Sequence, residues 1–363
     1  MLSIVLATAL VLIPSAQAPV SKTPAAPAGQ LTAATQAPKR TDVYDEKAVG
    51  AEQVAAALAK AKFAHKRVLI QWGANWCGWC IKLHDLYRKD KDIAHELLYE
   101  YELVRIDIGK WDKHLDLAAQ YQADFKKHGV PYLTVLDEDG KLVINQDSNP
   151  LELPADPSGA HDTGGIGHDA AKVLAFLKEN QAPRTEADAV FSAAVARAKK
   201  EGKSVFVHFS TPWCGWCRKL EGWMAQKDIA PIFDQSYVDV MIDAERYNGG
   251  ASMLTHYAGD KTDGPGYPWI VIVDANGTKL ADSYYAGDKN IGFPSDEAEI
   301  AHFLDMLSAS SKRMDPAVLE KVRLSLVSDR EQREKAQREA KDKLQREARE
   351  KAEPAAEKPT PGL

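Results

Sequence analysis

Four cysteines are the side chains best suited to chemistry in this 363-residue chain, and they fall in two identical Trp-Cys-Gly-Trp-Cys pentapeptides. A cysteine attacks as the thiolate, and its pKa falls when the sulfur faces the free N–H groups at the start of a helix. Cys77 and Cys214 each stand where a strand-like run gives way to a helix-like one. Cys80 and Cys217 follow three residues later, on the same helix face, at a Cα separation that a disulfide can bridge. Each pair is therefore predicted to exchange disulfides, the first thiolate forming a mixed disulfide and the second cysteine resolving it.

The two pentapeptides belong to an internal repeat. Residues 68–83 align with residues 205–220, and residues 129–132 align with residues 266–269. Both alignments have the same shift of 137 residues, so the chain is a tandem duplication. Its length also suits two domains of common size, each with its own core.

Each copy has the same order of predicted elements. An Ala-rich helix precedes a continuous apolar run that is typical of a strand buried on both faces. The hairpin turns, Asp139-Gly140 and Asn276-Gly277, use residues that tolerate positive φ. In the two copies the other predicted elements are the first helix (51–62; 186–200), a second strand (103–107; 238–243), a second helix (115–121; 252–257), hairpin strands (132–136 with 141–145; 269–273 with 279–284) and a closing helix (169–179; 297–307). Strands mixed with crossover helices imply an α/β sandwich with a partly parallel sheet.

A strand, Trp-Cys-Gly-x-Cys, a helix and a later proline that opens a hairpin resemble the thioredoxin superfamily. The resemblance covers residues 42–180 and 184–310. It implies two tandem thioredoxin-like α/β sandwich domains, in which the first cysteine of each pair attacks and the second resolves. The catalytic residues that it implies are Cys77 and Cys80 in the first copy and Cys214 and Cys217 in the second.

The resemblance also implies a substrate-binding surface beside each disulfide. In that family the proline has a cis peptide bond and lies against the disulfide, and the backbone before it is free to pair with an extended substrate. The residues marked in this way are Val130 and Pro131 in the first copy and Tyr267 and Pro268 in the second. Trp76 and Trp213 match an exposed aromatic flank of the family, although packing against the helix start is an equal alternative for both.

Two positions depart from the family pattern. Thioredoxins have a buried acid six residues before the attacking cysteine, where it aids proton transfer to the resolving thiol. Gln71 and His208 occupy these places here. His208 is either a base for the second centre or a core residue with satisfied hydrogen bonds.

Three other histidines are predicted at the surface. His84 follows the first cysteine pair. His161 lies in the Pro- and Gly-rich loop 147–167, which the resemblance places beside the substrate groove, and His168 comes at the end of that loop. No metal ligand is predicted among them. A shared zinc site is a weak alternative, because the two cysteine pairs are 137 residues apart in separate folded units.

Composition defines the ends of the chain. Residues 1–18 contain an apolar run and a small-x-small stretch, which predict a signal peptide, and the Pro/Ala-rich residues 19–41 predict a flexible linker. Residues 311–363 form a charged tail, predicted to be a solvated helix or disordered. A short apolar stripe follows Asp315-Pro316, a good helix start.

The net charge of −6 is too mild to suggest nucleic acid as a partner.

These observations favour an exported, periplasmic or secreted thiol-disulfide oxidoreductase that reduces or isomerises protein disulfides. Its expected partners are proteins with disulfides or thiols and an external electron donor or acceptor. No flavin or nicotinamide motif is present, and no cofactor or stable membrane insertion is expected. The alternative is a thioredoxin-like scaffold that binds unfolded or partner proteins without redox turnover. The direction of exchange stays open, because it depends on reduction potential.

Overall fold

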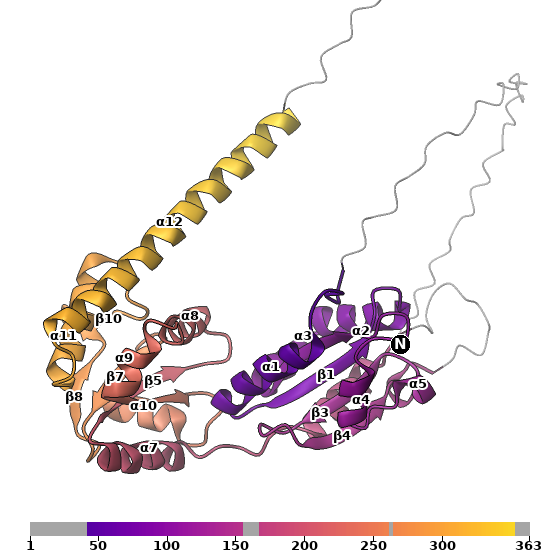
Figure 1. Ribbon diagram of the computed structural model, residues 1–363, viewed down its shortest axis with the longest axis horizontal. Coiled ribbons are helices and arrows are strands. Elements are labelled where there is room, and N and C mark those ends of the chain that lie inside the picture. Colours follow the sequence, from indigo (N-terminus) through magenta and orange to yellow (C-terminus); the bar gives the residue numbers. More distant parts are fainter. Residues whose placement is uncertain (1–41, 155–166, 261–263, 353–363) are drawn as a thin grey trace, which may run out of the picture. The chain divides into compact units, whose positions relative to one another are not determined.

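The computed structural model describes residues 42–154, 167–260 and 264–352, with side chains up to residue 349 (Figure 1). The predicted signal peptide, the linker, His161 and the end of the charged tail lie outside the described residues. Within these limits the chain is a mixed α/β protein, with two sheets of four strands each.

The first repeat builds its sheet in the order β2-β1-β3-β4. β1 pairs with β2 in parallel and with β3 antiparallel, and β3 and β4 form the predicted hairpin. Its elements are α1 (Gly50–Ala64), β1 (Arg67–Gly73), α2 (Gly78–Lys89), α3 (Lys91–Glu100), β2 (Tyr101–Asp107), α4 (Leu115–Gln120), α5 (Phe125–His128), β3 (Tyr132–Leu136), β4 (Leu142–Asp147), the 3-10 helix η1 (Asn149–Leu151) and α6 (Ala170–Glu179).

The second repeat has the same topology, in the order β6-β5-β7-β8. Its elements are α7 (Ala187–Glu201), β5 (Ser204–Ser210), α8 (Gly215–Met224), α9 (Ala230–Ser236), β6 (Tyr237–Asp243), α10 (Gly250–Ala258), β7 (Trp269–Val273), β8 (Lys279–Asp282), β9 (Tyr284–Tyr285), β10 (Lys289–Asn290), α11 (Glu297–Ser310) and α12 (Pro316–Ala352). The predicted α/β sandwich architecture and the duplication are confirmed.

One predicted strand is wrong at its end. Residues 279–284 do not form a continuous strand, because β8 ends at Asp282 and the next residues pair with β10 instead. Ser283 marks the break: its N–H donates to the Ile270 carbonyl of β7, and its own carbonyl accepts the N–H of Ile291. The hydroxyl of this buried serine also accepts the Ile270 N–H. A side-chain oxygen therefore takes the place of a backbone carbonyl as the partner of β7 at the point where the chain leaves β8.

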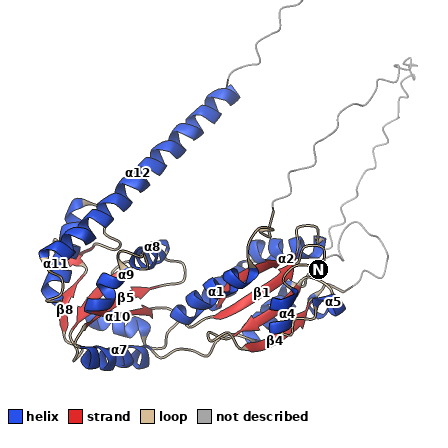
Figure 2. Ribbon diagram, in the orientation of Figure 1, coloured by secondary structure: helices blue, strands red, loops and turns tan. Residues whose placement is uncertain are grey.

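Side chains alternate between the two faces of the sheet along the central strand, and this decides which of them lie beneath α2, the helix that begins at the cysteine pair. Val68, Ile70 and Trp72 of β1 pack with α1 and α4 on one face. Leu69 packs with α2, α3 and α6 on the other face, and Gln71 shares that face because side chains two residues apart point the same way. The equivalent positions in β5 put His208 on the side of α8, the side on which Phe206 packs. Figure 2 shows the helices of the chain in blue beside its strands in red. Gln71 and His208 therefore lie on the face that carries the cysteine helix.

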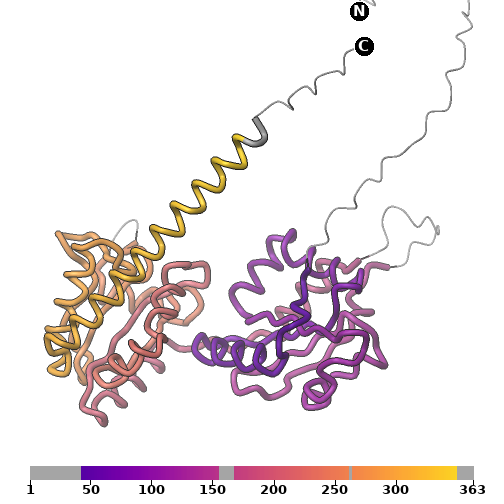
Figure 3. Tube along the Cα trace, turned by 45° about the horizontal axis from the view of Figure 1, so that its top comes forward, coloured from indigo at the N-terminus to yellow at the C-terminus, as the bar shows by residue number. Residues whose placement is uncertain are grey.

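The beginning of the charged tail is a docked helix. The Asp315 carboxylate caps α12 by accepting the N–H groups of Ala317 and Val318, as its sequence predicts. Val322 and Leu326 are completely buried in the core of the second repeat, and α12 packs against α11. Figure 3 shows the start of the yellow helix lying against the orange part of the chain. The predicted apolar stripe is thus confirmed. Asp329 is still buried, and from residue 334 to the last described side chain the helix is exposed to solvent.

Candidate active site

Each cysteine pair sits at the first turn of a helix and is closed as a disulfide, with the two Cα atoms 5.3 Å apart. Cys77 is the N-cap of α2, and its sulfur accepts the N–H of Cys80 at 3.1 Å. Cys214 caps α8 in the same way and accepts the N–H of Cys217 at 3.0 Å. The free N–H groups of a helix start carry positive partial charge, so both sites favour a thiolate on the first cysteine when the disulfide opens.

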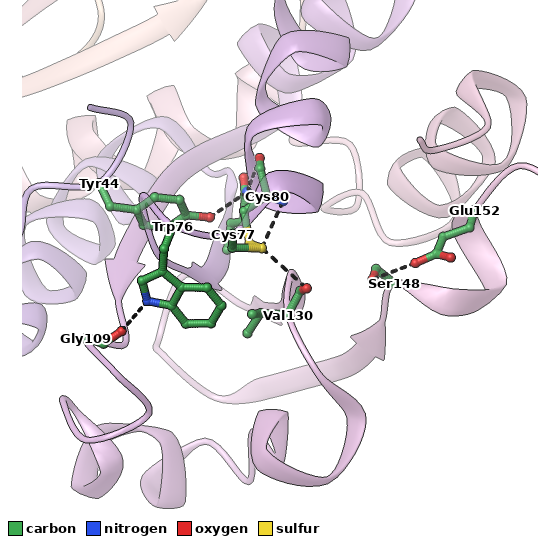
Figure 4. Close-up of a disulfide and its surroundings, with 9 residues drawn as sticks. Tyr44, Trp76, Cys77, Cys80, Gly109, Val130, Ser148 and Glu152 are labelled. Carbon is green, nitrogen blue, oxygen red and sulfur yellow. Dashed lines mark hydrogen bonds between the residues drawn. A yellow bond between two sulfur atoms is a disulfide. The ribbon is translucent and has the colours of Figure 1, made fainter. Parts of the chain in front are cut away.

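The segment before the hairpin reaches the first disulfide. The Val130-Pro131 peptide bond is cis, as the family resemblance implies, and so is Tyr267-Pro268. In the first repeat the Val130 carbonyl oxygen lies 3.5 Å from the Cys77 sulfur (Figure 4). The structure therefore brings the predicted backbone segment and the first cysteine together.

The tryptophans before the cysteines are partly exposed. Trp76 is 46% exposed and Trp213 is 53% exposed. Each indole N–H is nevertheless held: Trp76 donates to the Gly109 carbonyl at 2.6 Å, and Trp213 donates to the Glu245 carboxylate at 2.9 Å. Their rings are thus fixed as apolar surfaces at the edge of each centre, and neither ring is packed away in the core.

The tryptophans between the cysteines have different neighbours in the two repeats. The Trp79 ring meets the edge of the His168 ring at a centroid distance of 5.6 Å. Trp216 stacks on Phe293, and the guanidinium of Arg333 from α12 lies 5.5 Å from the Trp216 ring centroid. The charged tail thereby reaches the second redox motif, a contact that the sequence did not predict.

The surface prediction for His168 is wrong. Its ring is buried, and burial lowers the pKa of His168 to about 4. Its backbone pairs with that of Glu152 in an antiparallel β-bridge. The Leu153 N–H also donates to the Gly167 carbonyl, and together these contacts close the base of the long loop. The His168 ring and Trp79 therefore link this loop base to the redox motif.

His84 is not a fully exposed residue either. Its ring is half-buried, and its Nδ1 makes no hydrogen bond. Burial lowers the pKa of His84, and the nearby guanidinium groups of Arg105 and Arg88 lower it further. Burial and the two guanidinium groups thus both disfavour the charged imidazolium of His84.

His208 belongs to an acidic cluster behind the second cysteine pair. The ring is completely buried, and its Nε2 lies 3.5 Å from the Asp239 carboxylate of β6, which is about one-third exposed. Burial is the largest single effect and opposes the charged imidazolium, but the attractions to Asp239 and Glu221 together exceed it, so the pKa of His208 is raised above its ordinary value of 6.5. Glu221 lies one helical turn beyond Cys217, so this cluster extends along α8.

The pH dependence of the second centre should reveal the role of His208. In a Cys77→Ser/Cys80→Ser background, the rate of resolution by Cys217 is expected to rise as the pH passes the raised pKa, because only the neutral imidazole accepts a proton. His208→Gln should remove this inflection in stopped-flow exchange.

Stability provides the control for this variant. A raised folded-state pKa stabilises the fold below pH 6.5, and the stabilisation is lost as the pH rises through that pKa. Denaturation of His208→Gln should therefore show a larger loss at pH 5.5 than at pH 8.5. Such a stability change with an unaltered rate profile would make His208 a structural residue only.

Across residues 42–154, 167–260 and 264–349, no three His, Cys, Asp or Glu side chains are grouped so as to hold a metal ion. Among the helices that the structure describes, none is long and apolar enough to cross a bilayer.

Comparison with known proteins finds a thioredoxin-like family model, disulfide isomerases and a disulfide bond reductase. A family model described as thioredoxin-like matches residues 50–138 and 186–275. Protein disulfide-isomerase erp38 of Neurospora crassa is 25% identical over 242 residues, covering 66% of this chain and 57% of that protein. Disulfide bond reductase DsbH of Chlamydia pneumoniae is 29% identical over 108 residues, covering 27% of this chain and 63% of that protein. The chain thus spans less than two thirds of the length of either relative. A solved disulphide isomerase from Xylella fastidiosa Temecula1 is 28% identical, covers 38% of this chain and 95% of that chain, and has a TM-score of 0.31.

Proposed function

The chain belongs to the thioredoxin-like family through both of its repeats, and we propose that it is a thiol-disulfide oxidoreductase with two separate exchange centres. One observation carries the proposal. Each repeat closes its two cysteines into a disulfide at the first turn of a helix, where backbone N–H groups stabilise the thiolate that opening releases. Proteins named as disulfide isomerases and a disulfide bond reductase are among the relatives, which supports the same chemistry.

We assign the attacking role to Cys77 and Cys214. Each thiolate attacks a substrate disulfide and forms a mixed disulfide, and the first substrate sulfur leaves as a thiolate. Cys80 or Cys217 then attacks its partner cysteine, which re-forms the internal disulfide and releases the second substrate sulfur. An external dithiol must reduce the centre again before another reductive turnover, whereas an isomerase returns the electrons to the substrate.

The substrate segment is proposed to lie between the aromatic flank and the cis-proline segment. The Val130 carbonyl oxygen, 3.5 Å from the Cys77 sulfur, is placed to accept an N–H from an extended peptide, as in strand addition. Trp76 offers a fixed, partly exposed ring beside it. Tyr267, Pro268 and Trp213 take the same places in the second centre, where the Trp213 and Tyr267 rings meet edge to face at 5.8 Å.

We further propose domain limits of 42–180 and 184–310 and a site of action in the periplasm or outside the cell. The domain limits follow the repeated elements, each copy running from its first helix to its closing helix. The location is supported by the apolar run at residues 2–13, which favours export. Extracytoplasmic proteins also supply disulfide substrates in quantity.

Catalysed reduction of insulin by dithiothreitol tests the activity. Catalytic amounts of the full chain are expected to shorten the lag before the insulin B chain precipitates, because cysteine pairs at helix starts exchange faster than a small dithiol. A lag equal to that of dithiothreitol alone, with insulin still able to bind, would instead support the scaffold alternative.

A further inference from the structure

The first centre has a buried hydroxyl beside its resolving cysteine, from a segment outside the aligned repeat. Tyr44 precedes α1, is 1% exposed and forms a small cluster with Cys77 and Cys80. Figure 4 shows its hydroxyl end turned towards the cysteine pair. Resting on the oxidoreductase function proposed above, we propose that the Tyr44 hydroxyl donates a hydrogen bond to the Cys80 sulfur and assists the resolving step of the first centre.

Gly73 shows how closely the two groups approach. A Cβ atom at this position would lie 2.3 Å from the Tyr44 hydroxyl oxygen and 2.7 Å from the Cys80 sulfur. Both distances are far below a van der Waals contact, so the oxygen and the sulfur border the same small space beside the end of β1. Only a residue without a side chain leaves that space to them.

Gln71 fixes the direction in which the Tyr44 proton points. Its Nε2 lies 3.3 Å from the Cys80 carbonyl oxygen, which can only accept, so the amide nitrogen must face that side. The same Nε2 donates to the Tyr44 hydroxyl oxygen at 2.7 Å. The hydroxyl oxygen thus accepts from Gln71, and its own proton is left to donate to a neighbouring acceptor. Burial raises the pKa of Tyr44 well above its usual value, which keeps this proton in place at neutral pH.

Asn75 holds the Tyr44 segment in position. Its side-chain oxygen accepts the N–H groups of Val43 and Tyr44, both at 2.9 Å, and its Nδ2 donates to the Tyr44 carbonyl at 2.9 Å. Because Asn75 stands two residues before Cys77, these bonds tie the tyrosine to the redox motif itself. Tyr44 is thereby positioned by the active-site turn, although 31 residues of sequence separate it from Asn75.

The second repeat lacks this arrangement. Ser210 and Pro212 replace Gly73 and Asn75, and the residue 137 positions after Tyr44 is Gln181, which bonds Glu96. The second centre has the His208 cluster instead. The two cysteine motifs are identical, but the polar side chains next to them differ. The first centre has a tyrosine and a glutamine, and the second has a histidine with carboxylates.

The Tyr44 hydrogen bond affects the resolving step of the first centre. Cys80 loses its proton, its thiolate attacks the Cys77 sulfur of the mixed disulfide, the Cys77–Cys80 bond forms and the Cys77–substrate bond breaks. The departing substrate thiolate takes up the proton. A thiolate on completely buried Cys80 lacks water, so a hydrogen bond from Tyr44 compensates for that loss. Besides Tyr44, the charged or titratable groups around this site are Arg105, Tyr87 and Asp107.

The test separates attack from resolution in the full chain with Cys214→Ser/Cys217→Ser, so that only the first centre reacts. Reduced protein is mixed with one equivalent of 5,5′-dithiobis(2-nitrobenzoate) in a stopped-flow instrument. Attack by Cys77 releases one nitrothiobenzoate, and resolution by Cys80 releases the second in a first-order phase. With this reagent the proton of Cys80 passes to the buffer.

Tyr44→Phe should slow the second release about tenfold at pH 7, since a hydrogen bond to a charged group is of that strength. It should move the pH midpoint of that phase upward by about one pH unit and leave the first release within about twofold. Gln71→Met should also slow the second release, because it removes the donor that orients the hydroxyl. Tyr101→Phe is the control: it removes a buried hydroxyl of the same repeat that donates to the Leu177 carbonyl, and both phases should stay within about twofold.

An unchanged second release in Tyr44→Phe, or equal slowing of both phases, would overturn the role of Tyr44. No release of nitrothiobenzoate by the parent with intact Tyr44 would instead contradict the oxidoreductase function itself.

Discussion

Cys77→Ser and Cys214→Ser should each leave part of the insulin-reducing activity, and the double variant should leave none above the background of dithiothreitol. Each repeat contains a complete cysteine pair at its own helix start and its own cis-proline segment, so neither centre needs the other's sulfur. The double variant removes both attacking thiolates, an effect of several orders of magnitude on the catalysed rate.

Resolving-cysteine variants control for the fold in this experiment. Cys80→Ser/Cys217→Ser keeps both nucleophiles and should form mixed disulfides with insulin that dithiothreitol reverses. Complete loss of activity in either single attacking-cysteine variant would show that the two centres act as one.

In the fully reduced chain, iodoacetamide should modify Cys77 and Cys214 on the order of a hundredfold faster than Cys80 and Cys217. The first cysteine of each pair accepts a helix N–H at its sulfur, and the second is completely buried. Peptide mapping after timed alkylation measures the four rates separately.

Guanidinium chloride provides the control for this comparison, since unfolding removes both the helix and the burial. All four cysteines should then react at rates within a few-fold of one another. Equal rates in the folded chain would mean that the helix start does not activate the first cysteine.

The fold was largely predictable because its signals are local. Apolar runs such as β1 and β5, buried on both faces, and the Gly140 and Gly277 turns, with φ of 80° and 82°, identify the sheet and its hairpins from the sequence. The break at Ser283 was not predictable in this way, because it depends on hydrogen bonds to β7 and to Ile291 across the sheet.

The site was predictable only where the residues lie in the motif. The cysteine pairs follow from the repeat and the cis-prolines from the resemblance to the thioredoxin superfamily, but Tyr44 reaches its place through Asn75, a contact that no spacing rule indicates. The Pro- and Gly-rich loop predicts a surface position for His168, whereas its burial comes from the loop base and from Trp79. Arg333 lies in a charged run whose composition indicates solvent, yet the docking of Val322 and Leu326 carries it to Trp216.

Equilibration with glutathione buffers tests the central claim most directly. Each cysteine pair is trapped by acid, alkylated and quantified by mass spectrometry across a series of buffer potentials. Exchange-active disulfides have potentials above about −300 mV, whereas structural disulfides lie below it. The account predicts that Cys77–Cys80 and Cys214–Cys217 each pass from disulfide to dithiol in a two-electron transition above that value. Two pairs that stay oxidised in every glutathione buffer would contradict it.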